Sequence, residues 1–159
     1  MENLFRGSGF VNYVSSIHLQ QLCELANKRF HRLTKNQLSL SINESNEFEV
    51  IDYLNNGYSR SVKTLSGGQA FQASLCLALA LAENIQALNK ADKNFFFIDE
   101  GFGTQDLESI NTVFETLQYL NLENRVVGII SHVEELKERI PRSVTISKDN
   151  ERGSQVNVN

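Results

Sequence analysis

The pattern of hydrophobic and polar positions opens with a helical stretch. Apolar side chains recur at steps of mostly three and four residues from residue 10 to about residue 33, which is the spacing of one face of an amphipathic helix. The positions that carry this spacing are Phe10, Val11, Val14, Ile17, Leu22, Leu25, Ala26 and Phe30. The pattern predicts one long helix at the start of the chain.

After residue 33 the helical spacing changes to alternation. Apolar and polar residues alternate over 38–42, and the alternation resumes over 48–52 after a polar, turn-prone run. Alternation is typical of strands with one buried face, so we expect a β-hairpin within residues 34–57. The Asn-Asn-Gly run at 55–57 is expected to end this hairpin.

Longer apolar runs follow in the second half of the chain. Residues 70–82 are so rich in alanine and leucine that nearly every face of a helix would be apolar, which predicts an interior helix. The short apolar runs at 95–98 and 126–130 indicate strands buried on both faces, as in a parallel sheet between layers of helices. A helix over about 106–120 is expected between them.

The last segments complete the predicted fold. A short helix over 134–139 is followed by alternating segments at 144–146 and 155–158, which flank a turn-prone run and predict a terminal β-hairpin. The order strand, helix, strand, helix favours an α/β fold with a largely parallel sheet flanked by helices.

Composition narrows the class of protein. The chain of 159 residues is about one domain long, and its single proline leaves no room for a proline-rich linker. The formal charge of -4 and the isoelectric point near 5.4 supply no broad basic field for nucleic acid. One local basic group is interpreted as a solvated face, because charged residues mostly lie outside. Its members are Lys28, Arg29, Arg32 and Lys35.

The two cysteines and the first residues of the chain bear on the cellular compartment of the protein. Cys23 and Cys76 fall within helical patterns, which indicates buried, reduced thiols of a cytoplasmic protein. The opening residues 1–3 are not the basic start of a signal peptide. No apolar run approaches the roughly 18 residues that a membrane helix needs, so no membrane partner is expected.

The first segment with candidate chemistry is Leu65-Ser66-Gly67-Gly68-Gln69. Ser66 and Gln69 have the spacing of a capping box, in which each side chain accepts from the backbone N–H of the other. Such a cap leaves the two glycines unexplained, since each costs about 0.5–1 kcal/mol relative to alanine in a helix. Consecutive glycines at a helix start also let a phosphate approach free N–H groups. A structural cap and an anion site both remain open.

The second segment places Asp99 and Glu100 at the end of the strand 95–98. Ligands in open α/β sheets bind outside the carboxyl ends of strands, although an acidic turn is also a common start of a loop. One carboxylate of such a pair can hold Mg2+ while the other polarises a water for attack on phosphorus. His132 follows the strand 126–130 in the same way, which favours a phosphate contact over a filling role.

Together these residues resemble the carboxyl-terminal ATPase lobe of SbcC-type, SMC-like DNA repair ATPases of the ABC superfamily. Residues 65–69 resemble the ABC signature, 95–100 the Walker B strand, 101–106 the D-loop and 130–132 the switch histidine. The run Asp-Glu-Gly-Phe-Gly-Thr at 99–104 discriminates best, because transporter ATPases typically place a proline directly after the Asp-Glu pair.

The resemblance implies roles for individual residues in the use of ATP. Asp99 would join the shell of a Mg2+ ion, and Glu100 would orient the hydrolytic water. His132 would sense the γ-phosphate, and Asp106 would act across a dimer interface. The other nucleotide-binding residues would be those of the signature, Ser66, Gly67, Gly68 and Gln69.

A larger assembly is also implied. Residues 1–159 would be one carboxyl-terminal lobe of a P-loop NTPase-like head, with 1–33 at the re-entry of a coiled coil, 34–57 as a hairpin and 58–159 as the nucleotide region. Because the chain has no G-x-x-x-x-G-K-[ST] run, the Walker A motif would lie in a missing amino-terminal half. The implied partners are that half, a second head, an SbcD-like nuclease and double-stranded DNA.

In that assembly, Ser66 and Gly68 would contact the γ-phosphate of ATP held by the other head, and the head would gate the nuclease at DNA ends. The isolated chain would be inactive and would expose apolar surface that its missing half covers. Two alternatives stay open. One is an ATPase lobe of another ABC or SMC branch, and the other is a nonenzymatic interaction module in which the apolar helix 70–82 docks a partner.

Overall fold

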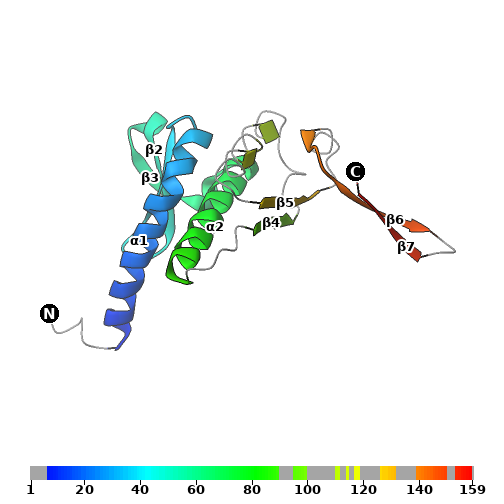
Figure 1. The fold of residues 1–159 in the computed structure, drawn as a ribbon. Coiled ribbons are helices and arrows are strands. Elements are labelled where there is room, and N and C mark those ends of the chain that lie inside the picture. Colours follow the sequence, from blue (N-terminus) through cyan, green and yellow to red (C-terminus); the bar gives the residue numbers. More distant parts are fainter. Residues whose placement is uncertain are drawn as a thin grey trace.

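The computed structural model describes residues 7–89, 95–99, 126–131, 139–149 and 153–158, together with residues 110, 111, 114, 117 and 118 (Figure 1). In chain order they form α1 (Gly7–Leu33), β1 (Leu38–Ile42), β2 (Phe48–Asp52), β3 (Tyr58–Ser61), α2 (Gly67–Asn89), β4 (Phe95–Asp99), β5 (Val126–Ile130), β6 (Val144–Asp149) and β7 (Gly153–Val158). Two short 3-10 helices, η2 (Tyr53–Asn55) and η3 (Val62–Thr64), flank β3. The expected α/β fold class, with a parallel strand pair and a terminal hairpin, is confirmed.

The N-terminal layer consists of α1 and an antiparallel sheet in the order β1-β2-β3. The expected long helix and the expected hairpin are both present, as α1 and as the β1–β2 pair. The sheet does not end at 55–57 as expected, because the chain turns there into β3. Asn56 and Gly57 adopt left-handed backbone, with φ of 53° and 74°, and this conformation lets the chain reverse direction tightly.

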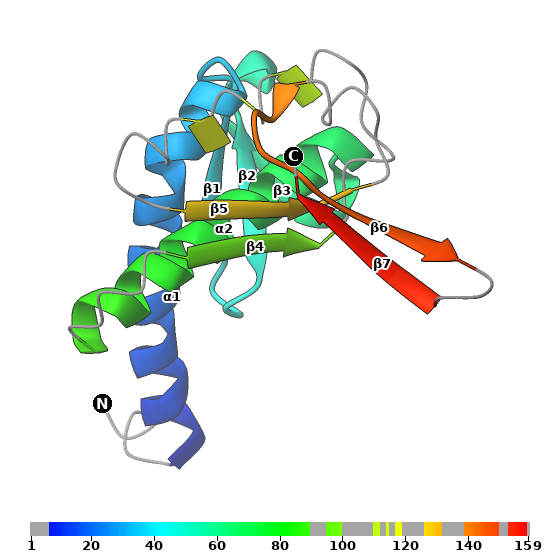
Figure 2. The same cartoon turned by 45° about the vertical axis from the view of Figure 1, so that its right-hand side comes forward.

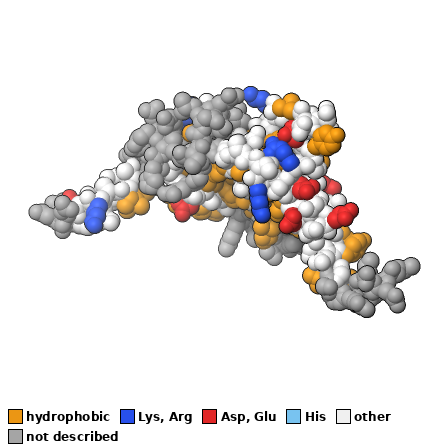
Figure 3. Space-filling view, turned by 180° about the vertical axis from the view of Figure 1, so that it is seen from behind, with side chains coloured by type: hydrophobic (Ala, Val, Ile, Leu, Met, Phe, Trp, Pro, Cys, Tyr) orange, Lys and Arg blue, Asp and Glu red, His pale blue; other side chains and the backbone are white. Residues whose placement is uncertain are grey.

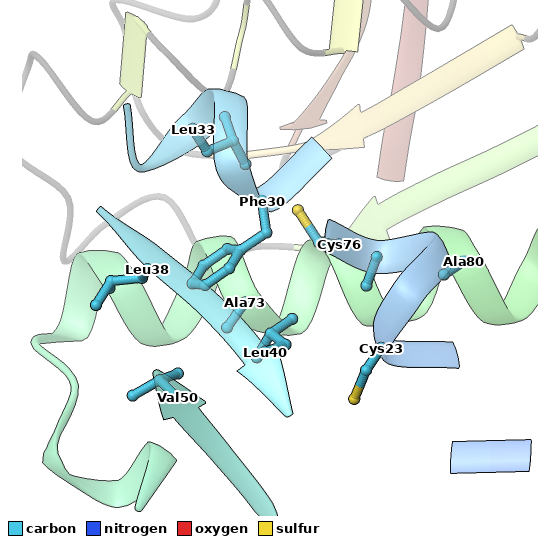
Figure 4. Close-up of a cluster of buried hydrophobic side chains, with 10 residues drawn as sticks. Cys23, Phe30, Leu33, Leu38, Leu40, Val50, Ala73, Cys76 and Ala80 are labelled. Carbon is cyan, nitrogen blue, oxygen red and sulfur yellow. The ribbon is translucent and has the colours of Figure 1, made fainter. Parts of the chain in front are cut away.

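A first hydrophobic cluster lies between α1, this sheet and α2 (Figure 4). The Phe30 side chain is fully buried, and its ring lies among Leu38, Leu40 and Ala73. The buried members of the first cluster are Cys23, Ala26, Phe30, Leu33, Leu38, Leu40, Val50, Ala73, Cys76 and Ala80. The C-terminal half of the α1 stripe predicted from periodicity, from Leu22 to Phe30, therefore packs against the sheet and α2. The N-terminal half does not, because Phe10, Val11 and Ile17 are exposed.

A second hydrophobic cluster involves a different face of α2. Its buried members are Leu75, Leu79, Ile98, Ile110, Phe114 and Leu117. Ala73, Cys76 and Ala80 of α2 belong to the first cluster, whereas Leu75 and Leu79 belong to the second. The prediction of an interior helix is confirmed for these two faces of α2, whereas Leu81 is 49% exposed.

The parallel strands β4 and β5 are covered on one face only. The side chains that pack toward the second cluster are Phe96, Ile98, Val127 and Ile129. The exposed apolar side chains of these strands, here called the open face, are Phe95, Phe97, Val126 and Ile130. The expectation that both faces are buried is thus wrong for the described residues, because α2 and the helical residues between 110 and 118 contribute to a single cluster.

Close packing against a neighbouring ring explains the glycine at position 128. Gly128 lies opposite Phe97 in the β4–β5 register. A Cβ at this position would lie 2.4 Å from Cδ1 of the Phe97 ring, which is closer than two carbon atoms can approach. The missing side chain therefore lets the Phe97 ring lie across the neighbouring strand on the open face.

The terminal hairpin of β6 and β7 projects from the rest of the molecule (Figures 1 and 2). Val144 lies opposite Val158 and Ile146 opposite Val156, so these four side chains share one face of the hairpin. All four are exposed, and Figure 3 shows hydrophobic side chains both on the hairpin and in the middle of the molecule. A two-stranded hairpin is marginal by itself in water, so this apolar face is a surface for further packing.

Polar contacts of Arg29 and Asn27 help to hold α1 against its neighbours. Arg29 donates to both carboxylate oxygens of Glu83 on α2, at 3.0 and 2.5 Å. The Asn27 side chain donates to the carbonyl oxygen of Leu40 on β1 and accepts from its N–H, at 2.9 and 2.8 Å. The interpretation of the basic group as a solvated face is therefore wrong for Arg29, whose side chain is 16% exposed.

The ion pair between α1 and α2 predicts a stability effect. Glu83→Gln is expected to lower the free energy of unfolding by about 1–2 kcal/mol, because it leaves a half-buried guanidinium with a neutral partner. Urea unfolding followed by circular dichroism measures this change. Glu44→Gln, in the exposed turn between β1 and β2, is the matched control. Equal effects of the two substitutions would show that the pair contributes nothing.

The buried cysteines predict slow labelling of the native chain. Burial raises the pKa of the Cys23 thiol from 9.0 to about 11 and that of Cys76 to about 12. Unfolded thiols ionise at lower pH, so the stability that the native thiols provide is present below pH 9 and is lost as pH rises toward these values. Because the thiolate is the reactive form, iodoacetamide at about pH 8 should label the native chain slowly and the urea-unfolded chain quickly. Mass spectrometry reads both sites, and equal rates in the two states would contradict the burial of these thiols.

Candidate functional site

The N-terminus of α2 carries the predicted signature residues. Oγ of Ser66 accepts from the N–H of Gln69 at 3.3 Å, and Oε1 of Gln69 accepts from the N–H of Ser66 at 3.3 Å. The carbonyl oxygen of Ser66 accepts the first helical bond, from the N–H of Ala70 at 2.8 Å. The capping box predicted from the spacing of Ser66 and Gln69 is therefore formed.

Gly67 leaves this helix start open. Gly67 is exposed, and a Cβ built on it would meet nothing within 4 Å. Packing therefore does not require glycine at position 67. Within the described part of the chain, the N–H groups of Gly67 and Gly68 have no hydrogen-bond partner. Accessible N–H groups at the positive end of a 23-residue helix are the elements of an anion site.

Asp99 ends β4 at one edge of the parallel pair. It lies opposite Ile130 in the register, and its side chain is exposed. The two strands are parallel, so their carboxyl ends meet at this edge, where ligands bind in open α/β sheets. Glu100, Asp106 and His132 lie outside the described residues, and their assignment stays a prediction.

The signature turn and Asp99 are separate groups on one folded body. No hydrogen bond or ion pair between described residues links Asp99 to 66–69. The second cluster nevertheless packs Ile98 of β4 with Leu75 and Leu79 of α2, and Figure 2 shows both strands lying along that helix. The fold therefore sets the relative position of the two groups without a direct contact.

The carboxylate of Asp99 suits Mg2+, an ion that the phosphates of a nucleotide also bind. Over the described ranges, no three His, Cys, Asp or Glu side chains form a group that could hold a metal ion by themselves. Mg2+ is usually held by one or two carboxylates together with phosphate oxygens and water, so an exposed carboxylate at a ligand edge suits it.

The described helices include none that is long and apolar enough to cross a membrane.

Sequence reasoning missed one polar group beside the signature. Arg60 on β3 contacts Asp52 at the end of β2 and Thr64 of η3, two residues before Ser66. The signal that could have found it is the Asn-Gly pair at 56–57, because this dipeptide is typical of a turn between antiparallel strands. Reading it as a hairpin turn predicts β3 and brings Arg60 back toward β2.

Comparison with protein families gives a match to the model described as SbcC/RAD50-like, Walker B motif, over residues 36–119. A relative from Clostridium acetobutylicum, the SbcC subunit of the nuclease SbcCD, is 40% identical over 147 residues. A relative of the same name from Bacillus subtilis is 36% identical over 160 residues. These alignments cover 92% and 99% of this chain, but the chain spans only 13% and 14% of those relatives.

Comparison with solved structures supports the same fold. The SMC head domain from Thermotoga maritima matches with a TM-score of 0.64 at 16% sequence identity. The match covers 92% of this chain and 51% of that chain. The signature and Walker B segments identified from the sequence both lie inside the region that the family model matches. The chain belongs to the SbcC/RAD50-like Walker B family, and its fold is similar to that of an SMC head domain.

Proposed function

We propose that this chain is the carboxyl-terminal lobe of an ATP-binding and hydrolysing head in an SbcC-like protein. The observation that carries the proposal is the start of α2, where Ser66 caps the helix and Gly67 leaves the space beside the turn open. A helix start of this kind suits the γ-phosphate of a nucleotide that a second head holds. Gln69 stabilises the turn, because its Oε1 accepts a hydrogen bond from the N–H of Ser66.

The remaining roles belong to the carboxyl ends of the two parallel strands. Asp99 would hold Mg2+, which, when bound, neutralises phosphate oxygens of ATP. Glu100 would orient the water for hydrolysis, and His132 would contact the γ-phosphate. Asp106 would act across the interface with the second head. The register that places Asp99 beside Ile130 supports this arrangement, because both strands end at the same sheet edge.

The lobe needs an amino-terminal lobe to complete its nucleotide site. The chain contains no G-x-x-x-x-G-K-[ST] run, and it spans about one seventh of the relatives that it matches. The open face of β4–β5 supports the same view, because parallel sheets are normally covered on both sides. We propose that the amino-terminal lobe covers the open face and supplies the phosphate-binding loop.

The names of the relatives support a proposal for the role of the whole protein. They are named as subunits of the nuclease SbcCD, and the proposal for this chain is that ATP binding in paired heads gates an SbcD-like nuclease on double-stranded DNA ends. The net charge of -4 gives no broad basic surface, so DNA contact would be local or would involve the partner.

The packing of α2 favours this proposal over a nonenzymatic interaction module. In the module, the apolar helix 70–82 would dock a separate partner. In the structure, Ala73, Cys76 and Ala80 are buried in the first cluster and Leu75 and Leu79 in the second. Most of the apolar surface of the helix is therefore used by the fold of the chain itself.

Hydrolysis can be tested in a chimera, in which this chain replaces the matching segment of the Clostridium acetobutylicum relative. The chimera should hydrolyse ATP, and the isolated chain should not, because the isolated chain lacks a phosphate-binding loop. Glu100→Gln should lower turnover in the chimera by about a hundredfold or more, the usual contribution of a catalytic base, while ATP binding is retained. Phosphate release and equilibrium binding of ATP measure the two effects.

Glu47→Gln, an exposed carboxylate beside the β1–β2 turn, is the control and should leave turnover unchanged. Hydrolysis by the purified isolated chain that Glu100→Gln abolishes would contradict the need for a second lobe. A folded, dimerising chimera that never hydrolyses ATP would contradict the proposal as a whole.

A separate prediction concerns the open face. The isolated chain is expected to self-associate, because contiguous exposed apolar side chains tend to recruit a partner. Phe97→Ser and Ile130→Ser together should reduce the apparent mass in static light scattering, since these side chains are 70% and 54% exposed. Leu54→Ser, at an equally exposed apolar side chain in η2, should not change it. A chain that is strictly monomeric at high concentration would count against the open face as an interface.

A further inference from the structure

Arg60 connects the antiparallel sheet to the segment that leads into α2. Its Nε donates to Oδ2 of Asp52 at 3.2 Å, and its Nη1 donates to the carbonyl oxygen and to Oγ1 of Thr64 at 3.1 and 2.6 Å. The Arg60 and Asp52 side chains are 29% and 17% exposed, so this ion pair is half-buried. One guanidinium therefore holds the end of β2 and the end of η3 at a defined separation.

Both partners of Arg60 are held by further contacts. Oδ1 of Asp52 accepts from the N–H of Leu54 at 3.1 Å, which caps η2. Oγ1 of Thr64 donates to the carbonyl oxygen of Ser61 at 2.7 Å, across the turn of η3. Neither partner can rotate without breaking a second hydrogen bond, so the guanidinium is held in one place.

The carbonyl group that Arg60 holds lies next to the signature turn. Only Leu65 separates Thr64 from Ser66, and Leu65 is half-buried against the first cluster. The Thr64 carbonyl belongs to the peptide bond between Thr64 and Leu65, and peptide bonds are planar. Leu65 is itself held, because its N–H donates to the carbonyl oxygen of Val62 at 3.2 Å and its side chain packs against the first cluster. A displacement of the Thr64 carbonyl is therefore passed through Leu65 to the capping serine.

We propose that Arg60 is a positioning residue for the signature serine. It holds the Thr64 carbonyl so that Ser66 and the N–H groups of Gly67 and Gly68 present themselves to the nucleotide in the orientation that hydrolysis requires. Arg60 itself touches no nucleotide and acts through Ser66. The inference rests on the proposed function, because that proposal supplies the nucleotide.

The contacts at Arg60 explain why arginine suits this position. The planar guanidinium presents N–H groups in fixed directions and reaches Asp52 through Nε and Thr64 through Nη1 at the same time. Lysine offers one compact ammonium group on a flexible stem and does not reproduce this fork. Arg60→Lys therefore keeps the charge and loses the geometry.

The test is a double-substitution cycle in the chimera, with ATP turnover and half-saturating ATP concentration as readouts. Arg60→Gln should lower turnover by about tenfold, which corresponds to the loss of one hydrogen bond to a charged group. Combined with Ser66→Ala, Arg60→Gln should lower turnover no further than Ser66→Ala alone, because residues that act through one another are not additive. Losses that multiply would overturn the inference, since they would place Arg60 on an independent path.

A second measurement separates positioning from general stability. Hydrogen exchange on the 159-residue chain should show faster exchange at the Gln69 amide in Arg60→Gln, with unchanged exchange in β1. Uniformly faster exchange would assign Arg60 a structural role only. If Arg60→Gln prevents folding of the chimera, Arg60→Lys takes its place and should show a smaller loss of turnover with the same lack of additivity.

Control substitutions distinguish a failure of the positioning inference from a failure of the proposed function. Arg142→Gln, at an exposed arginine after the last described helical residue, should change neither readout. If Ser66→Ala and Glu100→Gln both leave turnover unchanged, the proposed function fails. If these two substitutions act as expected and the loss at Arg60 multiplies with that at Ser66, the positioning inference alone fails.

Discussion

The burial of α2 between two hydrophobic clusters is the constraint on which the described structure depends. Small side chains on one face, Ala73, Cys76 and Ala80, let α1 and the antiparallel sheet approach closely. Leu75 and Leu79 on another face pack against the second cluster, which includes β4. Because both cores share this helix, α2 is anchored on two faces, and the signature turn at Ser66 lies directly before the anchored helix.

The N-terminal layer serves as the platform for this helix start. Arg29 ties α1 to Glu83 on α2, and Asn27 ties α1 to β1. Arg60 connects the same sheet to the turn that enters α2. Charge-assisted hydrogen bonds are stronger than neutral ones and depend on geometry, so these polar groups orient elements that apolar packing holds together. The long helix α1 and the signature turn are therefore connected through the same antiparallel sheet and through α2.

The surfaces that the chain leaves uncovered are as informative as its cores. The open face of β4–β5 and the apolar face of the β6–β7 hairpin are exposed strand surfaces rather than scattered side chains. Parallel strands such as β4 and β5 are normally covered on both faces in α/β folds. In our proposal the amino-terminal lobe accounts for the open face, because it covers these strands and completes the head.

The sequence by itself determined the local elements and their chemistry. The spacing of Phe10 to Phe30, the alternation over 38–42 and the pairing of Ser66 with Gln69 depend on neighbours a few residues apart, and all three are seen in the structure. The residues predicted beyond Asp99, namely Glu100, Asp106 and His132, remain predictions. Only the tertiary structure decided that α2 serves two cores, that β3 returns to bring Arg60 to Asp52, and that one face of β4–β5 is open. These features depend on which distant segments meet, and periodicity along the chain carries no information about the partner that covers a given face.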